Sequence, residues 1–381
     1  MLRSGNSFAF EAELRCGFHD GVAMRFTTFL SLITLAFLAL TIARAQESAD
    51  EVDHDPSVCW SGEDRSASCL AMMRAHPRPK LEAILEDRYT LGQFSFWRVG
   101  PQAVDLFDAP GGDVIGQIPA GFNFVHATNT DIDGWIQRLG GEWIKRDEAE
   151  YAQASTFTGY LLPEDWQHPF AIILDKTGIY TSLRPGEHGS AQSGYVTRRY
   201  DLVNIFARQE DSDGNVWYLI GPHRWLRQEF VAMFAPATKP ADVSGRWMAV
   251  DLFEQTLIAY EDDKPVFATL VSSGLPDWST NEGVFEIWAR LDRDSMSGAT
   301  GAPDAYALQD VPWTMYFDGS ISLHGTYWHD DFGYRRSHGC VNLSVSDARW
   351  LYEWTAETEP DEYGDIVNRV YVFSSGQYAG E

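Results

Sequence analysis

From about Arg88 onward, short apolar runs alternate with turn signals, and this punctuation restricts the possible folds more than any other feature of the chain. Pro110-Gly111-Gly112 and Gly140-Gly141 are two such turns. Regularly spaced short strands between clusters of Gly, Pro, Asp and Asn are typical of small β-barrels and β-sandwiches. Because 381 residues are more than one ordinary core fills, we expect two or three domains of mainly β structure.

The net charge argues against two classes of partner. Asp and Glu number 55 against 29 Lys and Arg, and the formal net charge is −26. Such a chain repels the phosphate backbone of nucleic acids and the head groups of anionic lipids. We therefore expect neither a nucleic-acid partner nor electrostatic binding to a membrane.

The N-terminal segment predicts export. An apolar run over residues 26–42 follows Met24-Arg25 and ends at Ala43-Arg44-Ala45, a small-x-small cleavage pattern. We interpret residues 1–45 as a signal peptide, with translation starting at Met24 rather than Met1. A retained membrane anchor is the alternative, because the run of 17 residues lies at the short limit for a spanning helix. Cleavage would release the protein from the membrane into the periplasm, the cell wall or the medium.

The cysteines agree with an oxidising compartment. Of the four, Cys16 lies upstream of the predicted cleavage site. Cys59 and Cys69 lie ten residues apart in an acidic, helix-poor lead-in over 46–87, and we expect them to form a disulfide. Cys340 has no partner, so it is either a buried, inert side chain or a nucleophile.

A faint internal repeat occupies the middle of the chain. Asp131-Ile132-Asp133-Gly134-Trp135 is echoed by Asp211-Ser212-Asp213-Gly214-Asn215-Val216-Trp217, and each is followed by a Gly turn and a second Trp. These Asp-x-Asp-Gly sequences predict hairpin turns rather than calcium loops, because the further acidic ligands are missing. In turn and Trp spacing, residues 88–150 and 158–236 resemble bacterial SH3-like domains. They would bind wall peptide or glycan, or would pack without a ligand.

After a Pro-containing linker over 236–243, a third domain is expected. Apolar runs at 247–251, 256–260 and 266–271 predict a β-meander, and an Asp318-Gly319 turn predicts a hairpin between 315–317 and 321–324. A single helix is predicted after Ser344, which would act as its N-cap. The predicted apolar face of that helix is Ala348, Leu351, Tyr352 and Thr355.

The residues that indicate chemistry lie between His324 and Asn342. A thiol attacks as the thiolate, and an adjacent imidazole can take its proton and lower its pKa. We therefore predict Cys340 as nucleophile and His324, at a strand end, as base. Gly339 leaves room for a substrate carbonyl and permits N–H groups to face a developing oxyanion. On an extended backbone His338 would point elsewhere, because neighbouring side chains alternate.

Three other interpretations of these residues are weaker. Taken singly, Cys340 and the histidines fit a buried core. His324, His329, His338 and Cys340 offer zinc-ligating atoms, but their spacing lacks the close pairs of common structural zinc sites. In Cys–His wall peptidases the Cys precedes the His, whereas no His follows Cys340.

His324-Gly325, a loop, and Ser337-His338-Gly339-Cys340-Val341-Asn342 resemble the active-site signature of L,D-transpeptidases with a YkuD-type catalytic domain. Ser272-Ser273-Gly274 and Thr280-Asn281-Glu282-Gly283 resemble motifs upstream in the same family, with Asn281 in place of the usual Pro. The resemblance covers residues 244–374 and implies a β-sandwich with one packed helix. Asn342 stands where relatives often have Arg, which puts a carboxylate-binding role there in doubt.

The resemblance implies a two-step acyl transfer on peptidoglycan stem peptides without metal or organic cofactor. Cys340 would attack the carbonyl of the third stem residue and His324 would transfer the proton. The Gly325 carbonyl would orient the imidazole, and the N–H groups of Gly339 and Cys340 would bind the oxyanion. His338 would shape the pocket or assist. The predicted substrate-pocket residues are Ser337, Asn342 and Tyr327.

The resemblance leaves the acceptor of the acyl group open. A second stem would give a 3–3 crosslink, and a protein lysine would attach that protein to the wall. Water would make the enzyme an L,D-carboxypeptidase or a crosslink-cleaving amidase. A non-catalytic wall-binding protein is a further alternative.

Overall fold

The computed structural model describes residues 59, 66–93, 95–166, 169–299, 301–302, 304–358 and 367–377. The predicted signal peptide and its cleavage site lie outside these residues. All described residues belong to one compact unit, Asp55–Glu381. Within them, no helix is long and apolar enough to cross a membrane.

The predicted β-meander is confirmed, and it forms the centre of the first large sheet. Its strands pair antiparallel, and the last strand of the chain returns parallel to the first strand of the meander. The seven strands, in their order across the sheet, are β1 (Glu82–Ala83), β9 (Tyr160–Leu161), β18 (Lys264–Leu270), β17 (Thr256–Glu261), β16 (Arg246–Asp251), β24 (Arg369–Phe373) and β19 (Gly283–Glu286).

The second large sheet carries the predicted hairpin. Asp318 ends one strand and Gly319, with a φ of 56°, lies in the turn. The following strand pairs in parallel with a short strand that begins at Val341. The strands of this part of the sheet are β20 (Ala289–Gly298), β21 (Tyr306–Asp318), β22 (Ile321–Gly325) and β23 (Val341–Leu343).

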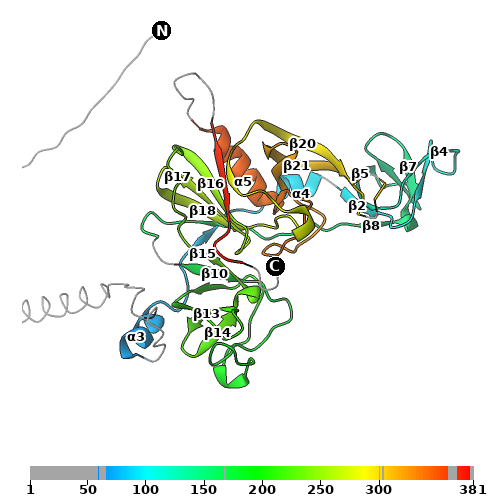
Figure 1. The fold of residues 1–381 in the computed structure, drawn as a ribbon. Coiled ribbons are helices and arrows are strands. Elements are labelled where there is room, and N and C mark those ends of the chain that lie inside the picture. The colour runs from blue at the N-terminus through cyan, green and yellow to red at the C-terminus, as the bar shows by residue number, and fades with distance from the viewer. Residues whose placement is uncertain are drawn as a thin grey trace, which may run out of the picture. The chain divides into compact units, whose positions relative to one another are not determined.

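Helix α5 (Val345–Ala356) follows β23 directly, as predicted. The Ser344 hydroxyl caps it by accepting the Asp347 backbone N–H at 3.1 Å. Three of the four predicted face residues are buried, whereas Tyr352 is half-buried. Figure 1 shows α5 beside β16, β17 and β21. Sheets and helix share one core: Met248, Val250, Leu257, Phe267, Met315, Leu323, Val341, Leu351 and Trp354.

These elements confirm a mainly β protein whose C-terminal part is a β-sandwich with one packed helix. The second sheet also extends into the first predicted SH3-like segment, because β5 runs parallel to β21 with Phe122 paired to Tyr306. That segment contains α4 (Arg88–Gln93), β2 (Ser95–Val99), β3 (Val104–Phe107), β4 (Val114–Ile118), β5 (Phe122–Asn129), β6 (Trp135–Arg138), β7 (Trp143–Lys145), η1 (Arg146–Glu148) and β8 (Ala149–Tyr151).

The second predicted SH3-like segment repeats part of this order. In both segments a hairpin that includes the repeated Trp is followed by one 3-10 turn and a short strand. The SH3-like assignment and its boundaries remain predictions. The segment contains β10 (Phe170–Ile173), η2 (Ala191–Ser193), β11 (Leu202–Asn204), β12 (Ala207–Glu210), β13 (Val216–Gly221), β14 (Arg224–Arg227), η3 (Gln228–Phe230) and β15 (Val231–Phe234).

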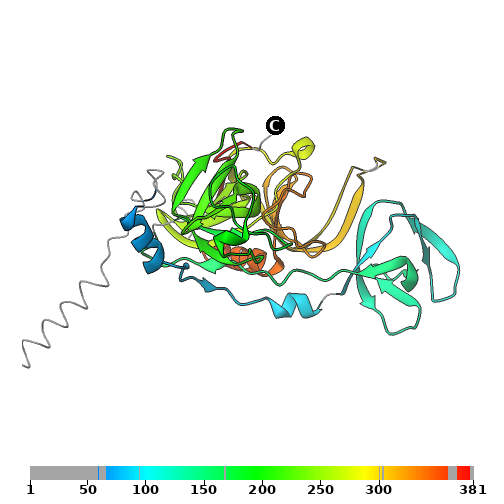
Figure 2. The same cartoon turned by 90° about the horizontal axis from the view of Figure 1, so that it is seen from below.

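The lead-in differs from the prediction in one respect. The Cys59–Cys69 disulfide is present. However, the segment is not helix-poor, because α3 (Ala67–Ala75) follows the Ser66 cap. Its apolar side chains, Met72 and Met73, share a core with aromatic residues of β13 and β14, and Figure 2 shows α3 in blue next to these green strands. Burial against a neighbouring sheet thus stabilises a helix that its local sequence predicts weakly.

Candidate active site

The strand pair β22–β23 brings the predicted nucleophile and base to one surface. In the parallel register His324 lies opposite Asn342, so their side chains face the same side of the sheet. Ser322, two residues before His324, faces that side too, and its Oγ lies 3.7 Å from the Cys340 Sγ. The sequence separation between Cys340 and His324 is therefore closed by strand pairing.

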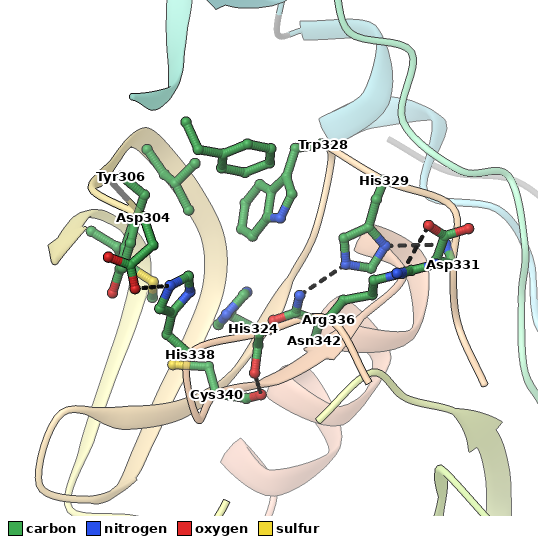
Figure 3. Close-up of a pocket in the computed structure, with 14 residues that line it drawn as sticks. Asp304, Tyr306, His324, Trp328, His329, Asp331, Arg336, His338, Cys340 and Asn342 are labelled. Carbon is green, nitrogen blue, oxygen red and sulfur yellow. Dashed lines mark hydrogen bonds and ion pairs between the residues drawn. The ribbon is translucent and has the colours of Figure 1, made fainter. Parts of the chain in front are cut away.

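This surface forms the floor of a cavity of about 500 Å³. Figure 3 shows the labelled side chains gathered around it. The lining residues are Phe122, Met296, Asp304, Tyr306, Leu308, His324, Trp328, His329, Asp331, Arg336, Ser337, His338, Cys340 and Asn342. Five of the predicted site residues are thus brought together here, with aromatic walls around them.

His324 is held as a neutral imidazole. It is 2% exposed, and burial lowers its pKa to about 4. Its Nδ1 lies 3.3 Å from the Gly325 carbonyl oxygen, which can only accept, so Nδ1 carries the proton and Nε2 is left as the basic atom. The predicted orienting role of Gly325 is therefore consistent with the geometry. A Cβ at Gly325 would lie 3.0 Å from the Pro312 ring, so glycine permits this close packing.

The Cys340 thiol is protonated in this state, contrary to the expected low pKa. Burial raises its pKa, and hydrogen bonds from the Ser322 backbone and hydroxyl offset only part of that effect. The thiol donates to the Ser320 carbonyl oxygen at 3.9 Å. Among the described residues, no hydrogen bond joins Cys340 to His324. A charged imidazolium would lower the pKa of the thiol, whereas the neutral His324 imidazole supplies no positive charge.

A tight turn presents Cys340. Gly339 has a φ of 116°, a backbone conformation that favours glycine. The Ser337 hydroxyl closes the turn by donating to the Cys340 carbonyl oxygen at 2.5 Å and accepting the Gly339 N–H at 3.1 Å. Because the Gly339 N–H is already bonded, it is not available to an oxyanion in this state. Of the two predicted donors, the Cys340 N–H remains. Ser337 lines the cavity, but its hydroxyl serves the turn.

His338 does not point away from the cavity. The backbone bends at residues 338 and 339 instead of extending, so the alternation rule does not apply. His338 lines the cavity with its Nε2 3.5 Å from an Asp304 carboxylate oxygen. The centroid of its imidazole lies 5.1 Å from the ring centroids of both Trp278 and Tyr306. His338 therefore contributes to the cavity wall that Asp304 and Tyr306 also form.

The prediction that Tyr327 lines the substrate pocket is wrong. The residue is fully buried outside the cavity lining. Its ring stacks on Phe96 at 3.5 Å between centroids, and its hydroxyl donates to the Gln309 carbonyl oxygen at 2.6 Å. Its neighbour Trp328 lines the cavity instead. Sequence alone did not identify Phe96, which comes from a distant segment, as a packing partner.

The upstream motif supports the nucleophile turn. The Thr280 hydroxyl donates to the Gly339 carbonyl oxygen at 2.8 Å and accepts the Gly274 N–H at 3.0 Å. The Ser273 carbonyl accepts the N–H of Ser337 at 3.1 Å. The upstream motifs are thus joined to the Ser337–Asn342 motif by direct hydrogen bonds.

The loop between His324 and Cys340 is fixed by residues of the second predicted SH3-like segment. Arg199 donates to an Asp330 carboxylate oxygen at 2.5 Å, and the Tyr200 hydroxyl donates to the other at 2.8 Å. Lys176 pairs with Asp331. These contacts hold a long irregular loop by its acidic residues. Sequence reasoning missed them because no local pattern links positions 130 residues apart.

Asn342 lines the cavity floor, as predicted, and is 2% exposed. Its side-chain nitrogen lies 2.9 Å from the His329 Nε2. The histidines considered as zinc ligands therefore have separate partners: His329 contacts Asn342, His338 contacts Asp304, and His324 contacts Gly325. Within the described residues, no group of three or more His, Cys, Asp and Glu side chains could hold a metal ion.

Phe122, Tyr306 and Trp328 were missed by the sequence analysis although they line the cavity. Ser322 was missed too, yet its signal was available: it lies two positions before His324 in a predicted strand and so shares its face. Phe122 had no such signal, because it reaches the cavity only through the pairing of β5 with β21.

Comparison with known proteins agrees with this site. Residues 245–372 match the family model of the YkuD L,D-transpeptidase catalytic domain. YciB of Bacillus subtilis (strain 168), a protein named as an L,D-transpeptidase, is 27% identical over 120 residues, which cover 28% of this chain and 59% of YciB. The chain thus spans less than two thirds of this relative.

Two solved structures are also similar to this chain. An L,D-transpeptidase from Stackebrandtia nassauensis is 29% identical, with 36% of this chain and 60% of that chain covered and a TM-score of 0.27. The C442S mutant of the Enterococcus faecium L,D-transpeptidase is 26% identical, with coverages of 37% and 55% and a TM-score of 0.29. TM-scores this low add nothing to the assignment, which rests on the family model and the motifs. Residues 245–372 form an L,D-transpeptidase catalytic domain of the YkuD family.

Proposed function

We propose that this chain is an exported cysteine L,D-transpeptidase that acts on peptidoglycan stem peptides through a Cys340 thioester. The observation that carries the proposal is the shared surface of β22 and β23, where Cys340 and His324 line one cavity while the His324 Nδ1 faces the Gly325 carbonyl. This arrangement leaves Nε2 as the only ring atom able to take the thiol proton.

The acylation step begins from a neutral pair, because burial raises the pKa of the Cys340 thiol and lowers that of His324 to about 4. Sγ attacks the carbonyl carbon of the third stem residue while its proton passes to the His324 Nε2. The imidazolium then gives the proton to the leaving nitrogen, and terminal D-alanine departs. General acid–base catalysis of this kind contributes about 10²- to 10⁴-fold in rate.

For this transfer, the thiol must turn from the Ser320 carbonyl towards His324. Catalytic hydrogen bonds are often long or absent without substrate and form in the substrate complex. As the thiolate forms, the Ser322 hydroxyl can donate to the sulfur, and the Cys340 N–H can donate to the oxyanion.

In the second step an amine attacks the thioester carbonyl, His324 takes its proton, and the thiol is released. We propose a second stem peptide as the amine, which yields a 3–3 crosslink, or a protein lysine, which attaches that protein to the wall. Phe122, Met296 and Leu308 form an apolar part of the cavity wall, against which the acceptor stem can pack. The predicted signal peptide and the Cys59–Cys69 disulfide support a location outside the cytoplasm.

The test uses the full chain and a tetrapeptide stem, with and without a second stem as amine acceptor. Mass spectrometry should detect a Cys340 acyl adduct that lacks D-alanine, and a crosslinked product when acceptor is present. Cys340→Ala should abolish both, and His324→Ala should slow acylation by about 10²- to 10⁴-fold.

Different outcomes identify the alternatives. Only hydrolysed product in the presence of abundant acceptor would establish a carboxypeptidase. Release of D-alanine at the normal rate by Cys340→Ala would refute Cys340 as nucleophile. Absence of any acylation would favour a non-catalytic wall-binding protein.

A further inference from the structure

The hydrogen bonds of His329 determine where its proton lies. Its Nδ1 accepts the Asp331 backbone N–H at 3.1 Å, so Nδ1 carries no proton. Burial lowers the pKa of His329 to about 4, so the ring is neutral near pH 7. A neutral imidazole has one N–H, and it must therefore be on Nε2, the atom that faces Asn342.

Asn342 must therefore present an acceptor, its amide oxygen, to the N–H group on the His329 Nε2. With its Nδ2 at 2.9 Å from the His329 Nε2, two N–H groups would face each other, and the amide oxygen would be buried with no partner. The two ends of a carboxamide have nearly the same shape, and hydrogen-bond partners decide which end is which. A turn of 180° lets Oδ1 accept the His329 N–H and moves the NH₂ group to the position without a partner.

The Asn342 side chain is part of the cavity wall, and Asn342 lies opposite His324 in the strand register. The side chain is 2% exposed, so the amide atom that does not face His329 lacks both a protein partner and ready access to solvent. An unpartnered buried polar atom is unfavourable unless a ligand satisfies it. The NH₂ group can donate only to an oxygen or an unprotonated nitrogen of that ligand.

We propose that His329 is a positioning residue, which fixes the Asn342 amide with its NH₂ group towards the cavity to bind a carbonyl or carboxylate oxygen of the peptide beside His324. This rests on the proposed function for the identity of the ligand as a peptide. The same amide in the opposite orientation would accept an N–H group instead.

The first test needs no activity. Nitrogen-15 NMR of the imidazole distinguishes the two neutral tautomers and the charged ring. In the full-length wild-type protein at pH 7, His329 should be neutral with its proton on Nε2. A proton on Nδ1, or a charged ring, would overturn the inference, because the orientation of the Asn342 amide would then lack the reason given for it.

The second test separates orientation from folding. His329→Phe removes the donor and frees the Asn342 amide to rotate, whereas His329→Gln keeps an N–H that can reach it. We expect kcat/KM for acylation of Cys340 by the tetrapeptide stem to fall about 3- to 10-fold in His329→Phe and to recover in His329→Gln. The change should lie mainly in KM. Alkylation of Cys340 by iodoacetamide should match wild type in both variants, which controls for damage to the thiol environment.

Two peptides distinguish the oxygen that is bound. If the loss in His329→Phe disappears when the stem lacks its terminal carboxylate, the ligand is the carboxylate; an equal loss indicates a backbone carbonyl. Equal acylation by wild type and His329→Phe would overturn the proposal. Failure of the wild type to be acylated would refute the proposed function, while the tautomer would still decide the orientation of Asn342.

Discussion

Replacement of Glu254 by glutamine should stabilise the protein, and increasingly so as the pH rises. Glu254 is 1% exposed in the turn between β16 and β17. Its carboxyl group accepts hydrogen bonds from the Tyr218 hydroxyl and, at 2.8 Å, from the Met233 N–H. No cation faces it among these contacts. Burial, assisted by the charge of nearby Asp251, therefore raises its pKa from 4.5 to about 8.

The sign and size of this change in stability follow from the difference in proton binding between the folded and unfolded chains. Below pH 4.5 the carboxyl is protonated in folded and unfolded chains, so it causes no loss of stability. As the pH rises to about 8, the unfolded chain releases the proton while the folded chain keeps it, and the folded state loses about 1.4 kcal/mol per pH unit. The full loss is about 5 kcal/mol above pH 8. The carboxamide introduced by Glu254→Gln cannot ionise; its oxygen can accept from the Met233 N–H, and its NH₂ group can donate to the Tyr218 hydroxyl oxygen, which reverses the direction of the hydrogen bond seen with glutamate.

Urea unfolding followed by circular dichroism at about pH 5, 6, 7 and 8 would measure this difference. The free energy of unfolding of Glu254→Gln minus that of wild type should rise by about 4 kcal/mol between pH 5 and pH 8. Groups common to both proteins cancel in this difference. Glu164→Gln is the matched control, because Glu164 is exposed and its pKa is lowered by hydrogen bonding to Lys264. A difference that does not change with pH would refute the assignment of a neutral buried carboxyl.

Three other substitutions test the active site. Ser322→Ala removes the hydroxyl 3.7 Å from the Cys340 sulfur and should shift iodoacetamide alkylation to higher pH; an unchanged profile would contradict this contact. Gly339→Ala, at a φ of 116°, should strain the turn by about 1–2 kcal/mol and abolish D-alanine release with the fold retained by circular dichroism; normal release would show that the turn tolerates a side chain. Arg199→Ala leaves the Asp330 carboxylate with fewer hydrogen-bond donors. It should speed amide hydrogen exchange in the loop between His324 and Cys340 and lower the free energy of unfolding in urea by about 1–3 kcal/mol. Unaltered exchange would show that the Arg199–Asp330 contact does not hold this loop.

Local patterns predicted the parts of the fold that local physics determines. The meander over 247–271 and the Asp318-Gly319 hairpin depend on apolar alternation and turn chemistry, both readable over a few residues. The cap of α5 is equally local, since Ser344 bonds a residue three positions away. Cys340 and His324 were predicted as nucleophile and base for a different reason: the spacing of a whole motif carries the resemblance.

Non-local contacts and the electrostatics of the site could not be predicted from the sequence. Tyr327 was misassigned because Phe96, its stacking partner, comes from another segment. The predicted direction of the Cys340 pKa shift was wrong. Burial, which depends on the complete cavity, raises this pKa, and the neighbouring imidazole does not lower it because that imidazole is itself neutral. Strand alternation could not place His338, because the backbone bends at residues 338 and 339 and the alternation rule holds only for an extended strand.

The cavity and the loop beside it also depend on residues outside the family match. The model match covers residues 245–372, which hold Cys340 and His324. Phe122, by contrast, comes from β5 and lines the same cavity, and Arg199 holds the loop that separates the two catalytic motifs. The cavity wall thus combines residues inside the family match with one residue, Phe122, from outside it. Under the proposed function, a change at Phe122 in β5 should alter which peptide fits against the aromatic wall without touching the thiol, whereas a change at Gly339 should affect every substrate alike.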